Sequence, residues 1–212
     1  MGKLPLIQTY FMDYSRRKFL LSASVLPFVG DSLFSSMFAY SKKEIVLVGL
    51  ADSGDKITRE IQKMGFKGKV YNIHVGKYDN LHIRLTERLL RGENIAARPN
   101  LLFSKFTEQK NIVPIFISGL GGIRSTYLSA LVHHEITKSK IPFQMFLTTP
   151  FEFEGALRIT RTKKFQLATE GNMCIKYINL NDCPRHIWPT INQGFTKFSP
   201  MMIYQEIKNI TT

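Results

Sequence analysis

Five short apolar runs, rich in β-branched residues, recur along the chain and alternate with segments of helical spacing. Near-continuous apolar strands are typical of a parallel sheet, because both faces of such a sheet are covered and must be shielded from water. The pattern therefore predicts an α/β fold: a doubly wound, mostly parallel, Rossmann-like sheet with helices on both faces. The predicted strands are Glu44–Leu50, Lys69–Val75, Asn111–Gly119, Ile141–Pro150 and Met173–Leu180.

The segments between the runs carry apolar residues three or four positions apart, which places those residues on one face of a helix. The predicted helices are Gly54–Gly65, Asp79–Gly92, a segment after Gly122 that turns Tyr127 inward, and a last helix opened by Ser199 as its cap and Pro200 as its first residue. Ligands bind at the carboxyl ends of parallel strands. We therefore expect one rim to gather Gly49–Gly54, His74–Lys77, Gly119–Thr126 and Thr148–Glu154.

The 212 residues carry a formal net charge of +13, which favours anionic partners such as nucleotides or an anionic membrane surface. The basic residues are scattered and no nucleic-acid motif is present, so we expect no nucleic-acid partner. Cys174 and Cys183 lack a neighbouring cysteine or histidine at ligand spacing, so no metal site is predicted. A disulfide between them requires that the chain be exported.

Residues 1–41 have the composition of a secretory leader. A basic cluster, Arg16-Arg17-Lys18, precedes an apolar run from Phe19 to Gly30 that is too short to cross the ~30 Å hydrocarbon core as a helix. The segment "SRRKFL" resembles a twin-arginine (Tat) signal, and Ala39-Tyr40-Ser41 offers a cleavage site before Lys42. Use of this leader predicts a periplasmic or envelope location. Without it, the segment is an apolar extension of a cytoplasmic protein.

A glycine turn joins the third predicted strand to the helix after it. The stretch "IFISGLGGIRSTYLSALVHHE", Ile115 to Glu135, has the order strand, glycine turn, helix N-terminus, which is that of a phosphate-binding loop. Backbone N–H groups at Gly119, Gly121 and Gly122 are candidate donors to phosphate oxygens, and the Thr126 hydroxyl is a further candidate.

The segment "LTTPFEFEGALR" (Leu147–Arg158) resembles a strand-loop-helix of the FtsZ/tubulin superfamily, whose bacterial members read Thr-x-Pro-Phe-x-Phe-Glu-Gly followed by an arginine. The glycine turn stands about 30 residues earlier, where that family has its glycine-rich signature. "VLVGLADSG" (Val46–Gly54) resembles the family's first glycine loop, and "RGENIAARP" (Arg91–Pro99) resembles another of its loops. The resemblance covers roughly Glu44 to Leu180.

This resemblance implies that residues 42–212 form an FtsZ-like nucleotide-binding domain of the tubulin/FtsZ GTPase type, without the family's second domain. It further implies GTP or GDP as ligand, self-association or an FtsZ-like partner, and a link to cell division. Glu154 and Arg158 match positions that contact the ribose and guanine side of the nucleotide. The implied nucleotide-binding residues are Gly49, Gly54, Gly119, Gly121, Gly122, Arg124, Ser125, Thr126, Glu154 and Arg158.

The phosphate loops depart from the family pattern. Ile123, Ser125 and Tyr127 stand where glycine lets the backbone approach phosphate, and a Cβ there occupies space beside the ligand. Arg124 partly compensates, because its charge can meet phosphate. Asp52 and Asp55 in the first loop repel phosphate unless a cation bridges them. Met202 and Ile203 replace an Asn-Asp pair that reads guanine.

Two functions follow from these observations. The first is a divergent FtsZ-like protein with degenerate phosphate loops, weak or lost GTP binding and impaired hydrolysis, a pseudo-GTPase for which no catalytic residue is assigned. The second is an exported or envelope-associated interaction module that uses the GTPase fold as a scaffold. A Rossmann-type oxidoreductase ranks last, because no Gly-x-Gly-x-x-Gly follows the first strand.

Overall fold

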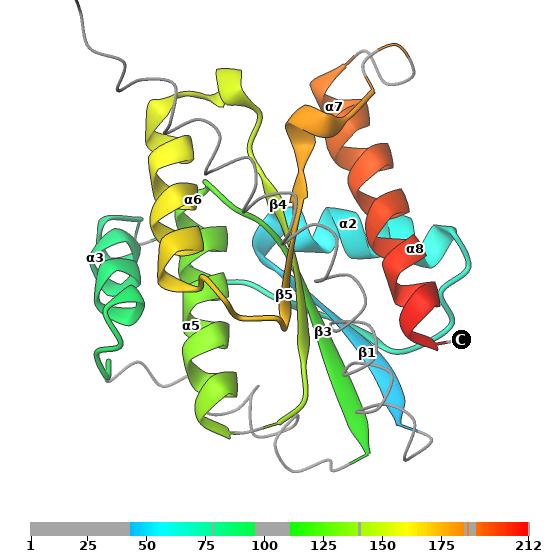
Figure 1. Ribbon diagram of the computed structural model, residues 1–212, viewed down its shortest axis with the longest axis horizontal. Coiled ribbons are helices and arrows are strands. Elements are labelled where there is room, and N and C mark those ends of the chain that lie inside the picture. The colour runs from blue at the N-terminus through cyan, green and yellow to red at the C-terminus, as the bar shows by residue number, and fades with distance from the viewer. Residues whose placement is uncertain are drawn as a thin grey trace, which may run out of the picture. The chain divides into compact units, whose positions relative to one another are not determined.

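The computed structural model describes residues 43–77, 79–95, 111–139, 141–184, 186 and 190–211. The predicted leader lies outside these residues. Within them, strands and helices alternate as the apolar pattern predicts (Figure 1). The strands are β1 (Glu44–Leu50), β2 (Val70–Ile73), β3 (Ile112–Gly119), β4 (Gln144–Thr149) and β5 (Ile175–Asn179). The main helices are α2 (Ala51–Lys63), α3 (Asp79–Leu90), α5 (Ile123–Ser139), α6 (Ala156–Ala168) and α8 (Ser199–Thr211).

The five strands form one sheet in the order β2-β1-β3-β4-β5, and every neighbouring pair is parallel. This confirms the predicted doubly wound parallel sheet. The chain leaves β1 toward one edge of the sheet and returns through β3 to build the other side. The boundary between β1 and β3 is therefore the topological switch point, where an open α/β sheet forms its ligand crevice.

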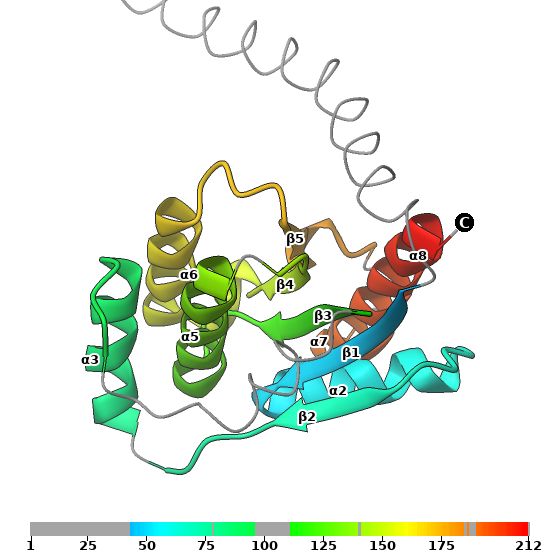
Figure 2. The ribbon, with the colours of Figure 1, turned by 90° about the horizontal axis from the view of Figure 1, so that it is seen from below.

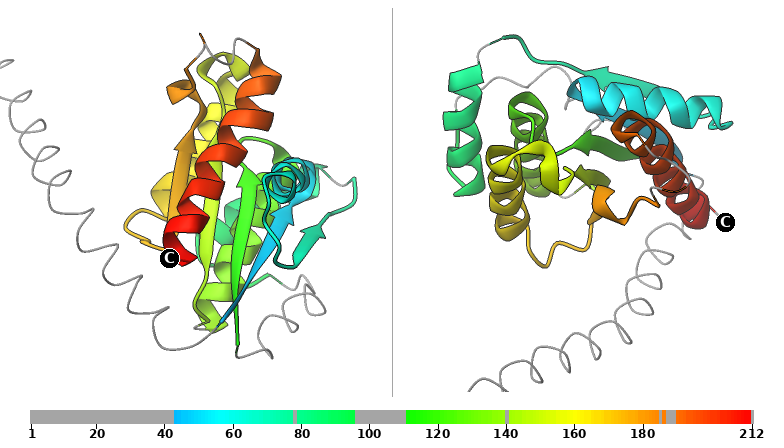
Figure 3. Two further views of the ribbon diagram at one scale, coloured as in Figure 1. Left: turned by 90° about the vertical axis from the view of Figure 1, so that its right-hand side faces the viewer. Right: turned by 90° about the horizontal axis from the view of Figure 1, so that it is seen from above.

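Helices cover both faces of the sheet (Figure 2). Along β1, Val46 and Val48 pack with α3, α5 and α6, whereas Leu47 packs with α2 and α8 on the opposite face. In β3, Phe116 packs on the face covered by α3, α5 and α6, and its neighbour Ile117 packs on the face covered by α2 and α8. Because successive strand residues point to opposite faces, a run that is apolar at every position fills both layers of the core. Figure 3 shows the helices on either side of the sheet.

Several predicted boundaries were wrong. The predicted strand Ile141–Pro150 shortens to Gln144–Thr149, and Met173–Leu180 shortens to Ile175–Asn179. The edge strand β2 spans only Val70–Ile73, because it pairs with β1 alone and half of its residues are exposed. The predicted loop Gly49–Gly54 does not exist as a loop, since α2 begins at Ala51, directly after β1. Ala51 takes φ +57 at this junction and is the single non-glycine residue with positive φ among the described residues.

The last helix also begins differently from the prediction. Short helical turns, α7 (Ile191–Gln193) and the π-helical turn η3 (Gly194–Phe198), lead directly into α8. Ser199 has φ −59 and ψ −50, which are helical values, so it continues a helix and does not cap one. Its hydroxyl is fully buried.

Candidate functional site

A cavity of about 510 Å³ opens at the carboxyl edge of the sheet, at the switch point. The β1–α2 junction leads to one face and the β3–α5 turn leads to the other, so the two turns separate and leave space between them. The turn after β4 and residues from η3 complete the wall. The lining residues are Ala51, Asp52, Ser53, Gly119, Leu120, Gly122, Ile123, Arg124, Ser125, Thr148, Thr149, Pro150, Phe151, Glu154, Arg158, Arg161, Leu180 and Phe195.

The glycine turn after β3 satisfies part of its own backbone. The N–H of Gly119 donates to Ser53 Oγ at 3.0 Å, and the N–H of Gly121 donates to Thr126 Oγ1 at 3.1 Å. Gly121 takes φ +91, and a Cβ there would lie 3.0 Å from the Cβ of Arg158, so glycine is required for both conformation and space. Two of the three N–H groups predicted for phosphate, and the Thr126 hydroxyl, therefore already have partners within the chain.

The N-terminus of α5 lies at the cavity. Gly122, Ile123, Arg124 and Ser125 all line it. The first N–H groups of a helix have no carbonyl one turn earlier to bond, and the helix dipole places partial positive charge at this end. Ile123, Ser125 and Tyr127 stand where the FtsZ-like signature has glycine. Of these three, Ile123 and Ser125 lie at the cavity.

Tyr127 lies elsewhere. Its ring is 5% exposed and stacks on His82 of α3, with centroids 4.7 Å apart. Burial raises the pKa of its phenol above the usual value. Tyr127 was predicted to point inward, and this is confirmed. It therefore takes no space from a ligand.

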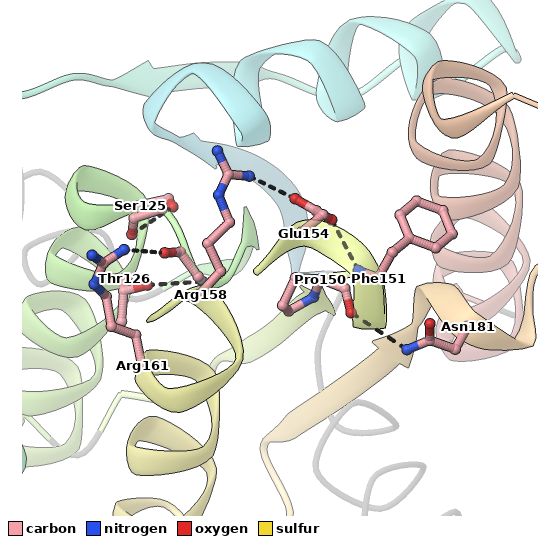
Figure 4. A network of polar contacts seen from close by, with 10 residues as sticks. Ser125, Thr126, Pro150, Phe151, Glu154, Arg158, Arg161 and Asn181 are labelled. Carbon is pink, nitrogen blue, oxygen red and sulfur yellow. Dashed lines mark hydrogen bonds and ion pairs between the residues drawn. The ribbon is translucent and has the colours of Figure 1, made fainter. Parts of the chain in front are cut away.

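The turn after β4, which carries "TPFEFEG", is held by three local interactions (Figure 4). The backbone N–H of Phe151 donates to Glu154 Oε1 at 2.9 Å, and Asn181 Nδ2 donates to the Pro150 carbonyl at 3.4 Å. The Phe151 ring is buried against Leu180 and its neighbours. Glu154 also accepts from Arg158 Nη1 at 2.6 Å. Glu154 therefore caps the turn and orients Arg158 at the rim of the cavity.

Arg161 lines the cavity and was missed in the sequence analysis. Its Nη1 donates to the Gly121 carbonyl at 2.7 Å, which brings its charge beside the glycine turn. It lies three positions after Arg158 in α6, and residues at this spacing share a helix face. That spacing was the available signal. Phe195, which lines the opposite wall, had no such signal.

The two aspartates of the predicted first loop have different surroundings. Asp55 is paired with Arg59 at 2.8 Å and accepts from Asn72 Nδ2 at 2.7 Å, and it does not line the cavity. Asp52 lines the cavity and has a side chain that is 79% exposed, with His74 Nδ1 3.4 Å away. Of these two aspartates, Asp52 is therefore the one that lines the cavity. From the predicted segment His74–Lys77, His74 reaches the site through this contact with Asp52.

Gly49 and Gly54 belong to the packing of α2 and do not line the cavity. A Cβ on either residue would lie 2.8 Å from the backbone carbon of the other. Glycine at both positions lets the first turn of α2 approach the end of β1. Their close approach explains the glycines without a ligand.

Met202 and Ile203 also stand away from the cavity, Ile203 being fully buried between α8 and the sheet. Part of the family-like segment Arg91–Pro99, residues 96–99, lies outside the described residues. In the described part of the chain, no group of three or more histidine, cysteine or acidic residues is arranged to hold a metal ion. None of the helices described there is long and apolar enough to cross a membrane.

No family model matches the sequence, and no curated protein matches it. In structure, the chain is similar to CetZ from Methanosaeta thermophila strain DSM 6194, a member of the tubulin/FtsZ superfamily, with a TM-score of 0.54 and 8% sequence identity. The fold is tubulin/FtsZ-like. The match covers 80% of this chain and 54% of CetZ, so this chain spans about half the length of that protein.

The tubulin/FtsZ-like fold agrees with the resemblance drawn from "TPFEFEG" at the level of architecture. At 8% identity the likeness concerns the fold alone. Within this tubulin/FtsZ-like fold, the predicted residues Gly119, Gly122, Arg124, Ser125, Glu154 and Arg158 line one cavity, whereas Gly49, Gly54, Gly121 and Thr126 support its walls.

Proposed function

We propose that this chain is a divergent FtsZ-like nucleotide-binding protein that holds the phosphates of GTP or GDP weakly and does not hydrolyse them. The observation that carries the proposal is the convergence of Arg124, Arg158 and Arg161 with the α5 N-terminus around one 510 Å³ cavity. A cavity of this size lies within the ~300–1,000 Å³ range of small-molecule sites. Guanidinium groups and a helix N-terminus together favour phosphate.

Weak binding follows from the donors that are already used. The N–H groups of Gly119 and Gly121 bond to Ser53 and Thr126, so a phosphate must break those bonds before it gains new ones. Arg158 is similarly engaged with Glu154. Asp52 adds a carboxylate at the same wall. We expect dissociation constants of about 0.1–1 mM, a binding free energy of roughly −4 to −5.5 kcal/mol.

The absence of hydrolysis is proposed from the groups beside the phosphate position. The carboxylates that line the cavity are Asp52 and Glu154, and Glu154 is committed to Phe151 and Arg158. A general base must reach the attacking water with a free acceptor. Asp52 is 79% exposed at the rim, and in the described part of the chain its one ion-pair contact is with His74, at 3.4 Å.

Calorimetric titration of the full chain with GTP, GDP, ATP and inorganic diphosphate tests the proposal. We expect saturable binding of all four, because the recognised group is the phosphate. Arg161→Gln is expected to weaken each ligand by about tenfold, since a charge-assisted hydrogen bond contributes about 1.5–3 kcal/mol. Lys163→Gln is the matched control: it removes one positive charge from the exposed side of the same helix, outside the cavity.

Three results would contradict the proposal. A flat titration at 10 mM of every ligand removes nucleotide binding and leaves the fold untouched. Equal losses in Arg161→Gln and Lys163→Gln mean that the ligands bind to the basic surface in general. Release of phosphate from GTP faster than in buffer contradicts the absence of hydrolysis.

A further inference from the structure

A second, largely apolar groove of about 310 Å³ lies between α3, α5 and α6, the three helices on one face of the sheet (Figure 2). Ile83 and Leu90 of α3 line one side, Leu157 of α6 lines the other, and Ile123 of α5 forms part of the floor. Leu157 is 74% exposed, so its side chain is accessible to a ligand in the groove.

Of the six polar side chains that line the groove, all but Thr160 bond to other groups of the chain. Lys164 of α6 pairs with Glu87 of α3 at 3.0 Å, across the groove. The Thr86 hydroxyl donates to the His82 carbonyl at 2.7 Å, and the Thr126 hydroxyl accepts from Gly121. A nucleobase placed here would leave its own polar groups unpaired, at a cost of about 1–3 kcal/mol for each. The groove therefore suits a hydrocarbon group.

The groove and the cavity at the switch point share two lining residues, Ile123 and Arg161. The Arg161 guanidinium reaches the Gly121 carbonyl, so its charge lies at the glycine turn, and its aliphatic stem is available to the groove. Ile123 presents an apolar side chain to both spaces. A single ligand that passes over Ile123 would place an anionic end among the arginines and an apolar end among Ile83, Leu90 and Leu157.

We propose that the chain binds an amphipathic phosphate ester, with its phosphate or diphosphate in the arginine-lined cavity and its hydrocarbon chain in the groove between α3, α5 and α6. The inference rests on the proposed anion site and names the class of ligand that it takes. The two ends of the ligand match the two spaces, positive charge against phosphate and apolar side chains against hydrocarbon. Ile123, which obstructs a nucleotide loop, becomes the point where the two spaces join.

The test is a calorimetric titration of the full chain with a series of n-alkyl phosphates, from methyl to octyl, each below its critical micelle concentration. Each methylene that enters an apolar site contributes about 0.8 kcal/mol. We therefore expect the affinity to rise by up to about fourfold per methylene and to level off when the groove is full. Octyl glucoside, which has the chain without the phosphate, is expected to bind at least tenfold more weakly than octyl phosphate.

Leu157→Glu and Leu167→Glu form a matched pair of variants. Both leucines lie on α6 with side chains 74% and 72% exposed, so neither change empties the core, and only Leu157 lines the groove. We expect Leu157→Glu to abolish the dependence of affinity on chain length, and it should also weaken methyl phosphate, because the new carboxylate lies one turn before Arg161. Leu167→Glu is expected to behave as the unmodified chain.

The outcomes separate this inference from the proposed function. Equal affinity for all chain lengths overturns the groove and leaves the anion site standing. The same chain-length dependence in both leucine variants, or equal binding of octyl glucoside, overturns the inference by showing non-specific adsorption. If methyl phosphate and inorganic diphosphate both fail to bind while octyl phosphate and octyl glucoside bind alike, the proposed anion site fails with it.

Discussion

In the proposed function, Ile123 limits which ligands the β3–α5 turn accepts. It is the first residue of α5 and lines both the arginine-lined cavity and the apolar groove. A glycine at this position would leave the helix N-terminus open to phosphate oxygens, whereas the isoleucine adds hydrocarbon beside them. The neighbouring replacement, Tyr127, has no such effect because its ring is packed on His82.

Ile123→Ala is expected to change the affinities for the phosphate end and the hydrocarbon end of the ligand in opposite directions. Removing most of the side chain opens the approach to the α5 N-terminus, so the affinity for inorganic diphosphate should rise by about three- to tenfold, a gain of roughly one charge-assisted contact. The affinity for octyl phosphate relative to methyl phosphate should fall, because hydrocarbon contact is lost. Calorimetry with the three ligands measures both. An unchanged diphosphate affinity would mean that Ile123 does not limit phosphate.

Ala51→Gly is expected to leave the stability of the fold nearly unchanged. Ala51 has φ +57, where an L-residue costs about 1–2 kcal/mol, and glycine's greater freedom in the unfolded chain costs about 0.5–1 kcal/mol in return. Loss of the Ala51 methyl, which is buried in the core, costs about a further 0.8 kcal/mol. The free energy of unfolding, measured by urea denaturation, should therefore change by less than about 1 kcal/mol. Ala156→Gly, in α6 and outside the left-handed region, is the control and should destabilise by up to about 1 kcal/mol.

Among the elements, α6 links the site to the opposite end of the same helical layer. Near its N-terminus, Arg158 and Arg161 reach the cavity, and toward its C-terminus Phe165 is fully buried against α5 and the sheet. His133 of α5 packs edge-on against Phe165 with ring centroids 6.5 Å apart, and its Nε2 lies 2.9 Å from Asn172 Nδ2. Packing at this junction therefore positions the helix that carries the arginines.

The stability of this junction should depend on pH. Burial lowers the pKa of His133 below the usual value, and the neighbouring His134 lowers it further. The pKa of His134 is lowered by burial and then by Lys138. The unfolded chain, in which histidine has a pKa of about 6.5, thus binds these protons more readily than the folded chain. The stabilisation that depends on neutral imidazoles is fully present above about pH 6.5. It is lost as the pH falls through the pKa values of His133 and His134 in the folded chain.

Urea denaturation at pH 7.5 and pH 5.5 measures this dependence. The free energy of unfolding should be lower at pH 5.5, and the difference should shrink when His133→Gln and His134→Gln are combined. Hydrogen bonds from Lys63 and Arg88 lower the pKa values of Glu60 and Glu93, respectively, below the usual 4.5. These two carboxylates therefore contribute little to the change in stability between pH 7.5 and pH 5.5. A double variant with the full pH dependence would assign it to other groups.

At the scale of the whole molecule, the order of the strands creates the site. Because β1 and β3 are neighbours whose following helices lie on opposite faces, their turns separate at the carboxyl edge. The helical layer of α3, α5 and α6 then brings the apolar groove beside that edge. One surface thus presents the proposed phosphate site and the proposed hydrocarbon site, although the segments that form them are distant in sequence.

The predicted leader gives an expectation for the whole chain. A reporter fused after Ser41 is expected to be exported, and Arg16→Lys combined with Arg17→Lys should reduce the exported fraction to background, because the twin-arginine pair is the recognised feature. Cell fractionation with an activity assay for the reporter measures this. Lys18→Arg, which keeps the charge and the arginine pair, is the control. A reporter that stays in the cytosol contradicts export and, with it, the envelope-associated module.

The sequence predicted the location of the site better than its individual contacts. The turn at Gly119–Gly122 and the "TPFEFEG" segment meet at one cavity, as expected for turns that follow neighbouring parallel strands. The contacts within that cavity depend on side chains far apart in the chain: Ser53 bonds Gly119, and Arg161 bonds Gly121. No local pattern records such pairs, so Arg161 was missed and Thr126 was assigned to phosphate.

The sequence by itself determined the parallel sheet, the two helical layers and the edge at which a ligand would bind. Hydrophobic periodicity is a local property, and burying those apolar runs leaves few arrangements other than a sheet covered on both faces. The tertiary structure alone decided that Gly49 and Gly54 serve packing, that Tyr127 turns away from the cavity, and that Ile123 joins it to the groove. These outcomes depend on which elements become neighbours in the fold. The local sequence of one segment does not specify the order of the strands in the sheet.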